Sequence, residues 1–283
     1  MEITLATHYG FCQGVKNAIN IVNNINHDNK PIYMLNKLVH NNNVCEQFIN
    51  NGIIILDDNR SLEEKINSIN EGTIIFSAHG HDKKLNTLAK NKNLNIIDTT
   101  CPKVILNEKS IIKALNENKT VIYIGIKKHP ETIASLSISN KIIFLDFFNP
   151  DYSLIENLDN VSVHNQTTLI QDDLKKINDV LIKKIKHIEI HNDICFATTL
   201  RQKCFDQITN EDVIFVIGDK ISSNSTRLYE VAKNKFKIDV YQISNLEEIK
   251  KLDLHKYKKG FITAGASTPD QVINPIIKYL TNY

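Results

Sequence analysis

Residues 95–102 read NIIDTTCP, a short β-branched run that gives way to a cysteine, Cys101, and then to a segment of helical periodicity. The same order occurs twice more, around Cys12 and Cys195. The spacings are nearly equal, at 89 residues from position 12 to 101 and 94 residues from position 101 to 195. A recurrence at this interval predicts one structural unit that is repeated three times.

Further polar residues recur at matching distances after the three cysteines. One set lies 27 or 28 residues after its cysteine and comprises His40, His129 and Ser222. A second set lies 66 to 72 residues after its cysteine and comprises His79, Thr167 and Ser267. Each of these residues stands where a β-like run gives way to a loop, so the repeat extends to the polar residues.

Apolar runs of strand length alternate with helix-period segments along the chain, which is typical of βα units in mostly parallel sheets. A further strand-like run precedes each cysteine, at residues 2–7, 95–98 and 187–191. The third repeat ends in a helix with no strand after it, so we expect residues 2–7 to complete the third sheet. We predict three α/β domains, related by a pseudo-threefold repeat around a central cavity: residues 8–100, 101–194 and 195–283.

The polar residues fall at the carboxyl ends of the predicted strands, where open α/β sheets bind ligands beside helix N-termini. Pro130 and Pro269 suit the first position of their helices. A helix that opens with Ser222, Ser223 and Asn224 would offer free N–H groups to an anion. Together with the recurring histidines and Ser267, these groups would form a cradle for a diphosphate.

The composition of the chain indicates a globular protein and argues against a nucleic-acid-binding or membrane protein. The chain has 283 residues, of which 42% are apolar and 23% are charged, as in an ordinary globular protein. Its net charge of +2 lacks the basic excess of a nucleic-acid-binding protein. The N-terminus has no basic or long apolar region, and no run of about 18 apolar residues occurs. We therefore expect a cytoplasmic protein that binds neither nucleic acid nor membrane.

The five cysteines do not resemble a disulfide framework, because their number is odd and the gaps between them are long. Thiolates from three repeats suit a soft metal, and iron-sulfur clusters are normally held by cysteine. Cys45 and Cys204 break the spacing, so we interpret them as core thiols. A 4Fe-4S cluster with three thiolates would leave one iron open to substrate. The alternative is that the three repeated cysteines are simply buried.

Glu131 follows His129 and Pro130 and is the carboxylate with a clear position beside the predicted cavity. One interpretation is a favourable charge at a helix N-terminus. The other is a proton donor, because a dry cavity would raise the pKa of the carboxyl group. Thr167 is similarly either a turn residue or a hydroxyl that orients a substrate hydroxyl.

Nine motifs, in order and over the whole chain, resemble those of the 4-hydroxy-3-methylbut-2-enyl diphosphate reductases, the IspH or LytB family. They are GFCQGV (10–15), VHN (39–41), SAHG (77–80), DTTCP (98–102), HPE (129–131), QTT (166–168), IC (194–195), SSN (222–224) and AGAS (264–267). Any one motif is weak, but nine in order are very specific.

The resemblance implies the last step of the non-mevalonate isoprenoid pathway, a two-electron, two-proton reductive dehydroxylation that gives isopentenyl and dimethylallyl diphosphates. It implies a ferredoxin or flavodoxin as electron donor and a 4Fe-4S cluster, with one open iron site, on Cys12, Cys101 and Cys195. Thr167 would hold the substrate hydroxyl and Glu131 would supply protons. The residues implied around the diphosphate are His40, His79, His129, Ser222, Ser223, Asn224 and Ser267.

The chain departs from the usual family pattern at Ala134, Asp193, Thr199, Leu200 and Asp219. None of these changes removes a predicted ligand, but Asp219 brings a negative charge near the predicted phosphate loop. Two other functions suit the same residues: a hydro-lyase that uses an open iron without net redox change, and a non-catalytic sensor that binds a diphosphate. Reductant-dependent turnover would distinguish the reductase from both.

Overall fold

The computed structural model describes residues 1–26, 31–39 and 41–283. By its internal contacts the chain divides into two compact units. The first unit comprises Met1–Lys16, Val39–Val44 and Cys195–Tyr283, and the second comprises Asn17–Leu38 and Cys45–Ile194. One parallel sheet lies in the first unit and two lie in the second.

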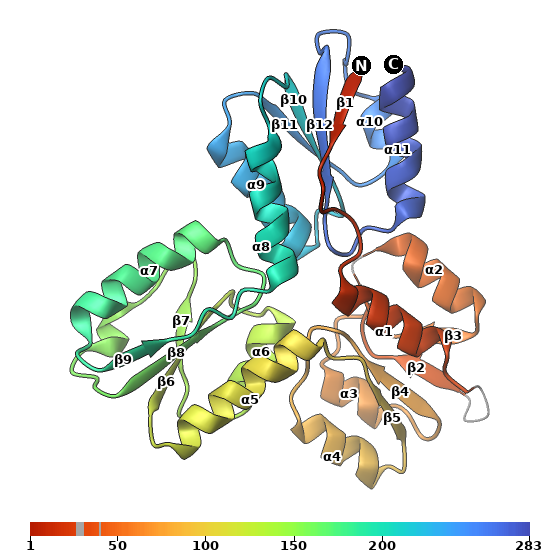
Figure 1. The fold of residues 1–283 in the computed structure, drawn as a ribbon. Coiled ribbons are helices and arrows are strands. Elements are labelled where there is room, and N and C mark those ends of the chain that lie inside the picture. Colours follow the sequence, from red (N-terminus) through yellow and green to blue (C-terminus); the bar gives the residue numbers. More distant parts are fainter. Residues whose placement is uncertain (27–30, 40) are drawn as a thin grey trace. The chain divides into compact units, whose positions relative to one another are not determined.

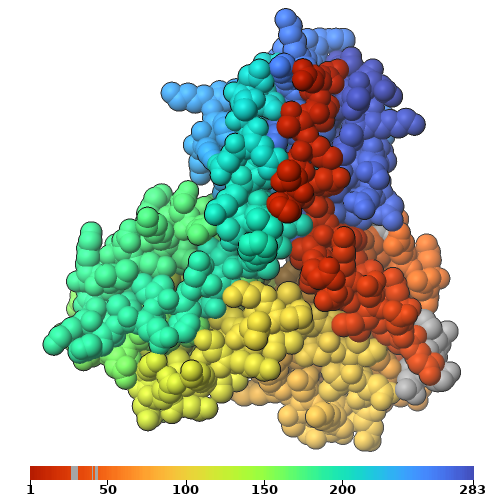
Figure 2. Space-filling view, in the orientation of Figure 1, coloured from red at the N-terminus to blue at the C-terminus, as the bar shows by residue number. Residues whose placement is uncertain are grey.

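The sheet of the first unit has the strand order β1-β12-β10-β11. Its strands are β1 (Glu2–Leu5), β10 (Val213–Ile217), β11 (Asp239–Ile243) and β12 (Lys259–Ala264). Strand β1 pairs in parallel with β12, with Glu2 opposite Lys259 and Leu5 opposite Ile262. Figure 1 shows β1 in red at the edge of this sheet, beside the blue β12, and in Figure 2 the red N-terminal segment lies against the blue C-terminal part. The N-terminal strand thus completes the third sheet, as its sequence position predicts.

The second unit contains two sheets, with the orders β3-β2-β4-β5 and β7-β6-β8-β9. The strands of the first are β2 (Ile32–Met34), β3 (Ile53–Ile55), β4 (Thr73–Phe76) and β5 (Asn95–Asp98). The strands of the other are β6 (Thr120–Gly125), β7 (Ile143–Asp146), β8 (Val161–Asn165) and β9 (Ile188–Ile190). Every pairing in the three sheets is parallel.

Helices connect the strands. They are α1 (Gln13–Asn23), α2 (Asn42–Asn50), α3 (Leu62–Asn67), α4 (Lys84–Asn91), α5 (Pro102–Asn116), α6 (Pro130–Leu136), α7 (Gln171–Lys184), α8 (Phe196–Lys203), α9 (Ser223–Lys235), α10 (Leu246–Lys250) and α11 (Asp270–Asn282), with 3₁₀ turns η1 (Tyr152–Ile155) and η2 (Cys204–Gln207). Across the residues that the structure describes, none of these helices has the length and apolar character needed to cross a membrane.

The three sheets share one strand order, so strands β2, β6 and β10 are equivalent, as are β4, β8 and β12. Strands β5, β9 and β1 form the third equivalent set. This agreement confirms the predicted α/β class with three similar parallel sheets. The domain boundaries at residues 100 and 194, and the central cavity, remain predictions.

Buried strands explain why these segments form parallel sheets. All five residues of β10, VIFVI, are buried, because helices cover both faces of its sheet. Phe215 packs with Ile273 and other residues of α11, whereas Ile214 on the opposite face packs with Leu228 of α9. The alternating side chains of one strand thus supply two cores.

Helix ends follow the local sequence with one correction. Pro130 occupies the first turn of α6, as predicted. Pro269 instead caps α11 from outside the helix, because its ψ of 157° is extended and the first helical residue is Asp270. Gly52, at φ +82°, follows α2 in the left-handed conformation that a glycine adopts easily.

Candidate functional site

Each of the three predicted cysteine ligands stands directly before a helix: Cys12 before α1, Cys101 before α5 and Cys195 before α8. All three side chains are partly exposed, whereas Cys45 and Cys204 are buried. Burial raises the pKa of the Cys45 thiol and raises that of Cys204 to about 11. The two buried cysteines therefore remain neutral thiols at neutral pH, which agrees with their interpretation as core residues.

In the second unit, the structure brings Glu131 and Thr167 into direct contact. The backbone N–H of Thr167 donates to Glu131 Oε1 at 2.8 Å, and the Thr167 hydroxyl donates to Oε2 at 2.9 Å. Glu131 is in the first turn of α6, and Thr167 follows β8, which neighbours β6 in the sheet. Both residues are buried, at 2% and 4% exposure. The pair therefore combines a carboxyl group and a hydroxyl group away from bulk water.

Burial raises the pKa of Glu131 to about 7, from 4.5. The hydrogen bonds from Thr167 oppose this rise, and the negative charges of Asp193 and Glu108 add to it. Although Glu131 does lie at a helix N-terminus, it is not a simple surface charge, because desolvation is the largest effect on it. A carboxyl group with a pKa near neutrality can hold a proton and release it at physiological pH.

His79 and His129 form a pair in the same unit. Their ring centroids are 5.9 Å apart and the rings are nearly perpendicular, at 85°. His129 Nδ1 accepts the backbone N–H of Glu131 at 3.2 Å, so the neutral ring carries its proton on Nε2. Cys101 adjoins this group, because its N–H donates to the carbonyl of Ala78 at 2.9 Å. The second unit thus brings together Cys101, His79, His129, Glu131 and Thr167.

In the first unit, Ser222 and Ser267 meet at the N-terminus of α9. Their hydroxyl oxygens are 3.0 Å apart, and Ser222 also caps the helix. Asn224 Oδ1 accepts the N–H of Ala266 at 2.9 Å, and its Nδ2 donates to Thr198 Oγ1 at 3.5 Å. The buried hydroxyl of Ser223 has no hydrogen-bond partner among the described residues. Helix N–H groups and several hydroxyls at one place form a suitable anion site.

Two glycines allow α9 to approach the sheet closely. A Cβ atom on Gly265 would lie 2.0 Å from Ser225 Oγ, and one on Gly218, which has φ +154°, would lie 2.3 Å from it. Neither position tolerates a side chain while Ser225 stays in place. The close packing brings the Ser222 end of the helix against the loop that carries Ser267.

Cys12 and Cys195 adjoin the same loops of the first unit. The N–H of Cys12 donates to the carbonyl of Ala266 at 3.2 Å. The carbonyl of Cys195 accepts the N–H of Thr198, and Thr198 Oγ1 lies 3.5 Å from the Asn224 amide nitrogen. The first unit therefore brings the two cysteines together with the serines and Asn224.

The structure bears differently on His40, on the three predicted cysteine ligands as a set, and on Asp219. His40 lies outside the described residues. The cysteines are divided between the units, with Cys101 in the second. Within the described ranges, no three histidine, cysteine or carboxylate side chains gather closely enough to hold a metal ion. Asp219 uses its carboxylate to accept the N–H of Ile221 at 3.1 Å, so it stabilises its own turn. The complete set of site residues remains a prediction.

Comparison with known proteins decides the family. Residues 3–281 match the family model described as LytB protein. This chain belongs to the LytB family. It is 38% identical over 290 residues to the 4-hydroxy-3-methylbut-2-enyl diphosphate reductase of Macrococcus caseolyticus, covering 100% of this chain and 90% of that protein. It is 34% identical over 291 residues to the Bacillus subtilis protein of the same name, covering 100% of this chain and 91% of that protein.

Solved structures support the same conclusion. The E-1-hydroxy-2-methyl-but-2-enyl-4-diphosphate reductase from Plasmodium falciparum superposes on this LytB chain with a TM-score of 0.86 and 30% identity, over 99% of this chain and 88% of that one. A second reductase structure, described as the terminal enzyme of the non-mevalonate pathway, has a TM-score of 0.71 and 28% identity, over 100% and 99% of the chains. The predicted family resemblance is confirmed.

Sequence reasoning on this LytB chain missed the role of Gln166, which is fully buried. Its Oε1 accepts the N–H of Ile126 at 3.0 Å and the hydroxyl of Thr132 at 3.3 Å, and its Nε2 donates to Thr168 Oγ1 at 2.8 Å. The side chain thus ties the loop and helix around Glu131 to the loop that carries Thr167. The available signal was the position of Gln166 directly after a strand, within the QTT motif.

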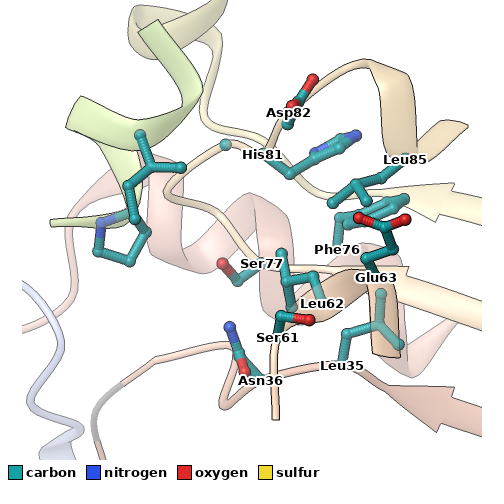
Figure 3. Close-up of a pocket in the computed structure, with 13 residues that line it drawn as sticks. Leu35, Asn36, Ser61, Leu62, Glu63, Phe76, Ser77, His81, Asp82 and Leu85 are labelled. Atoms are coloured by element: carbon teal, nitrogen blue, oxygen red, sulfur yellow. The ribbon is translucent and has the colours of Figure 1, made fainter. Parts of the chain in front are cut away.

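A cavity of about 330 Å³ lies beside the Ser77–Gly80 loop of this LytB chain, in the second unit. Its lining is Leu35, Asn36, Ser61, Leu62, Glu63, Phe76, Ser77, Gly80, His81, Asp82, Leu85, Pro130 and Ile133. Figure 3 shows the rings of His81 and Phe76 stacked near Leu85, with centroids 3.6 Å apart. His79 and His129 are not in the lining, so the cavity is distinct from the histidine pair. The sequence contained no signal for it.

Proposed function

We propose that this chain converts 4-hydroxy-3-methylbut-2-enyl diphosphate to isopentenyl and dimethylallyl diphosphates, the last step of the non-mevalonate isoprenoid pathway. The reaction breaks the allylic C–O bond, consumes two electrons and two protons, and releases water. Membership of the LytB family over the whole chain and the names of its relatives support this reaction. The observation that carries the proposal is the buried Glu131–Thr167 pair, in which the carboxyl pKa is about 7.

Glu131 and Thr167 act in proton transfer to the leaving hydroxyl group. The Thr167 hydroxyl orients the substrate hydroxyl, and protonated Glu131 gives its proton to the oxygen that leaves as water. The second proton goes to carbon, and protonation at either end of the allylic system gives one or the other product. The burial that raises the Glu131 pKa also keeps bulk water away from this step.

The diphosphate binds through imidazole, hydroxyl, amide and helix N–H donors. His79 and His129 are paired in the second unit, and Ser222, Asn224 and Ser267 meet in the first. Ser223 adds a buried hydroxyl that has no partner among the described residues, and the resemblance adds His40. Hydrogen bonds from such groups to a charged phosphate oxygen are short and strong, and they fix the position of the substrate hydroxyl.

Cys12, Cys101 and Cys195 would hold a 4Fe-4S cluster and would leave one iron open to substrate. The chemistry of the donors supports this assignment, because these three thiols are partly exposed at helix N-termini whereas the other two are buried and neutral. When bound, the cluster supplies the electrons and a Lewis-acidic iron for the hydroxyl. A ferredoxin or flavodoxin delivers the electrons to it.

Anaerobic purification followed by a turnover assay tests the function. We expect about four iron atoms and four sulfides per chain and product formation only when a reductant is present. The matching alcohol without its diphosphate should not react, because it lacks the binding anchor. Turnover without reductant would indicate the hydro-lyase, and an iron-free protein with full activity would refute the cluster assignment.

The pH dependence of kcat/KM reports on Glu131 of the free enzyme as the proton donor. Because the donor must be protonated, we expect kcat/KM to be level below a pH of about 7 and to fall about tenfold per unit above it. In T167V, one hydrogen bond that lowers the Glu131 pKa is lost, so the inflection should move to higher pH along with a lower maximum rate. A parent profile without an inflection near neutrality would contradict the assignment.

A further inference from the structure

Arg201, on α8, is a buried cation at 5% exposure that the proposed reaction does not use. Its Nη1 donates to the carbonyl of Ala197 at 2.8 Å, and its Nη2 donates to the carbonyl of Gly10 at 2.5 Å. Ala197 lies two residues after Cys195, and Gly10 lies two residues before Cys12. One guanidinium group therefore connects the segments that carry two of the predicted ligands.

The connection spans a large separation in the sequence, because Gly10 and Arg201 are 191 residues apart. Gly10 has φ +68°, a left-handed conformation that a glycine adopts without strain. A side chain at this position would approach Ile273 at 3.1 Å and the carbonyl of Thr268 at 3.4 Å. The N–H of Gly10 donates to the carbonyl of Ala264 at 3.3 Å, so the Gly10 backbone is anchored to the end of β12 while its carbonyl accepts from Arg201.

Among the described residues, no carboxylate is a charged neighbour of Arg201, and its Nε has no hydrogen-bond partner there. Burial lowers the Arg201 pKa, and Cys12, Cys195 and Cys204 act in the opposite direction. Cys204 has a pKa of about 11 and is neutral at neutral pH. Cys12 and Cys195, which would bind a cluster as thiolates, are therefore the groups beside this buried guanidinium that could offset its charge.

We propose that Arg201 is a positioning residue that fixes the Cys12 and Cys195 segments and offsets the charge of their thiolates, and that it thereby raises the reduction potential of the cluster they hold. The inference rests on the proposed iron-sulfur function. Reduction adds a negative charge to the cluster, and a nearby buried cation stabilises the reduced state because the surrounding dielectric constant is low.

Two substitutions separate the charge of Arg201 from its hydrogen bonds. R201Q removes the charge, so it should lower the reduction potential. R201K keeps the charge but loses the planar fork that reaches both carbonyls, so it should retain the potential and hold less cluster. The matched control is R227Q on α9 of the same unit, because Arg227 is ion-paired with Glu230 at 2.5 Å and has no cysteine among its charged neighbours.

The measurements are iron and sulfide per chain after anaerobic purification, the midpoint potential from a redox titration, and circular dichroism to check the fold. For R201Q we expect the equilibrium to shift at least tenfold toward the oxidised cluster, about 59 mV for one electron. The midpoint potential of R201K should differ from the parent's by less than this amount, while the iron content of R201K falls. R227Q should have the same midpoint potential and the same iron content as the parent.

An R201Q cluster with the parent's potential would overturn the inference while leaving the proposed function intact. If the parent itself holds no cluster, the proposed function fails and the inference fails with it. If R201Q cannot hold a cluster, the potential of R201K decides: a value near the parent's supports the role of the charge, and a tenfold or larger shift refutes it.

Discussion

Replacing Cys12, Cys101 or Cys195 by serine should remove iron from the chain and lower turnover by more than about a hundredfold. Substitution of a residue that only contacts a metal ligand lowers activity by up to about a hundredfold, and loss of the ligand itself should cost more. A serine hydroxyl keeps the size of the side chain but remains protonated, so it cannot replace a thiolate. Iron and sulfide analysis with the visible absorption of each variant measures the loss. The effect should be similar at all three positions because the repeat makes them equivalent.

The remaining two cysteines provide the matched control. C45A and C204A should keep their iron and turnover, because both thiols are buried in cores and neutral. C204A also removes the weak hydrogen bond to Thr263 Oγ1 at 3.5 Å, so it should cost about 1 kcal/mol of stability. Full iron in C101S, or complete loss of iron from folded C204A, would refute the assignment of ligands.

The substitution E131Q should lower kcat by roughly 10²- to 10⁴-fold, the usual contribution of a positioned acid. Glutamine retains the size of the side chain and can still accept the N–H of Thr167, but it has no proton to give. Iron content should be unchanged, since Glu131 is not a predicted ligand. Turnover of E131Q at the parent's rate would exclude Glu131 as the proton donor.

The same variant should be more stable than the parent at neutral and alkaline pH. The Glu131 pKa is about 7 in the folded chain and 4.5 in a free carboxyl group, so the folded state favours the protonated form. As pH rises from 4.5 to 7, the unfolded chain ionises freely and the parent loses stability, by roughly 3 kcal/mol in total. The Tm advantage of E131Q should therefore grow through this range and level off above pH 7.

Glu211 supplies a control in which the Glu-to-Gln substitution should change Tm in the opposite direction. It is 8% exposed, and although burial acts to raise its pKa, hydrogen bonds from Thr209, Thr4 and Asn210 hold that pKa below the ordinary value. E211Q should therefore have a lower Tm than the parent at pH 7, with the difference shrinking as the pH falls below about 4.5. A Tm difference for E131Q that does not change with pH would contradict the raised pKa.

The sequence predicted the order of elements well and their ends less well. The strand expected at residues 2–7 is Glu2–Leu5, and the strand expected at residues 187–191 is Ile188–Ile190. Such ends depend on which backbone groups find partners, and periodicity does not encode that choice. The bulk of each element was predictable because buried strands such as VIFVI and amphipathic helices have distinct patterns.

Much of the candidate site was also predictable, because Thr167 and Ser267 follow the equivalent strands β8 and β12, and His129 and Ser222 follow the equivalent strands β6 and β10. The contacts between side chains were not. The three hydrogen bonds of Gln166 and the cavity near His81 arise from packing between segments that are distant in the sequence. No local pattern records which distant side chains meet.

The sequence by itself therefore determined the class of fold, the threefold recurrence and the positions of the candidate site residues at strand ends. These properties follow from local periodicity and from the direction of the chain in a parallel sheet. Only the tertiary structure decided the pKa of Glu131 and the link from Arg201 to Gly10. Both depend on burial and on distances between residues far apart in the chain, which folding alone creates.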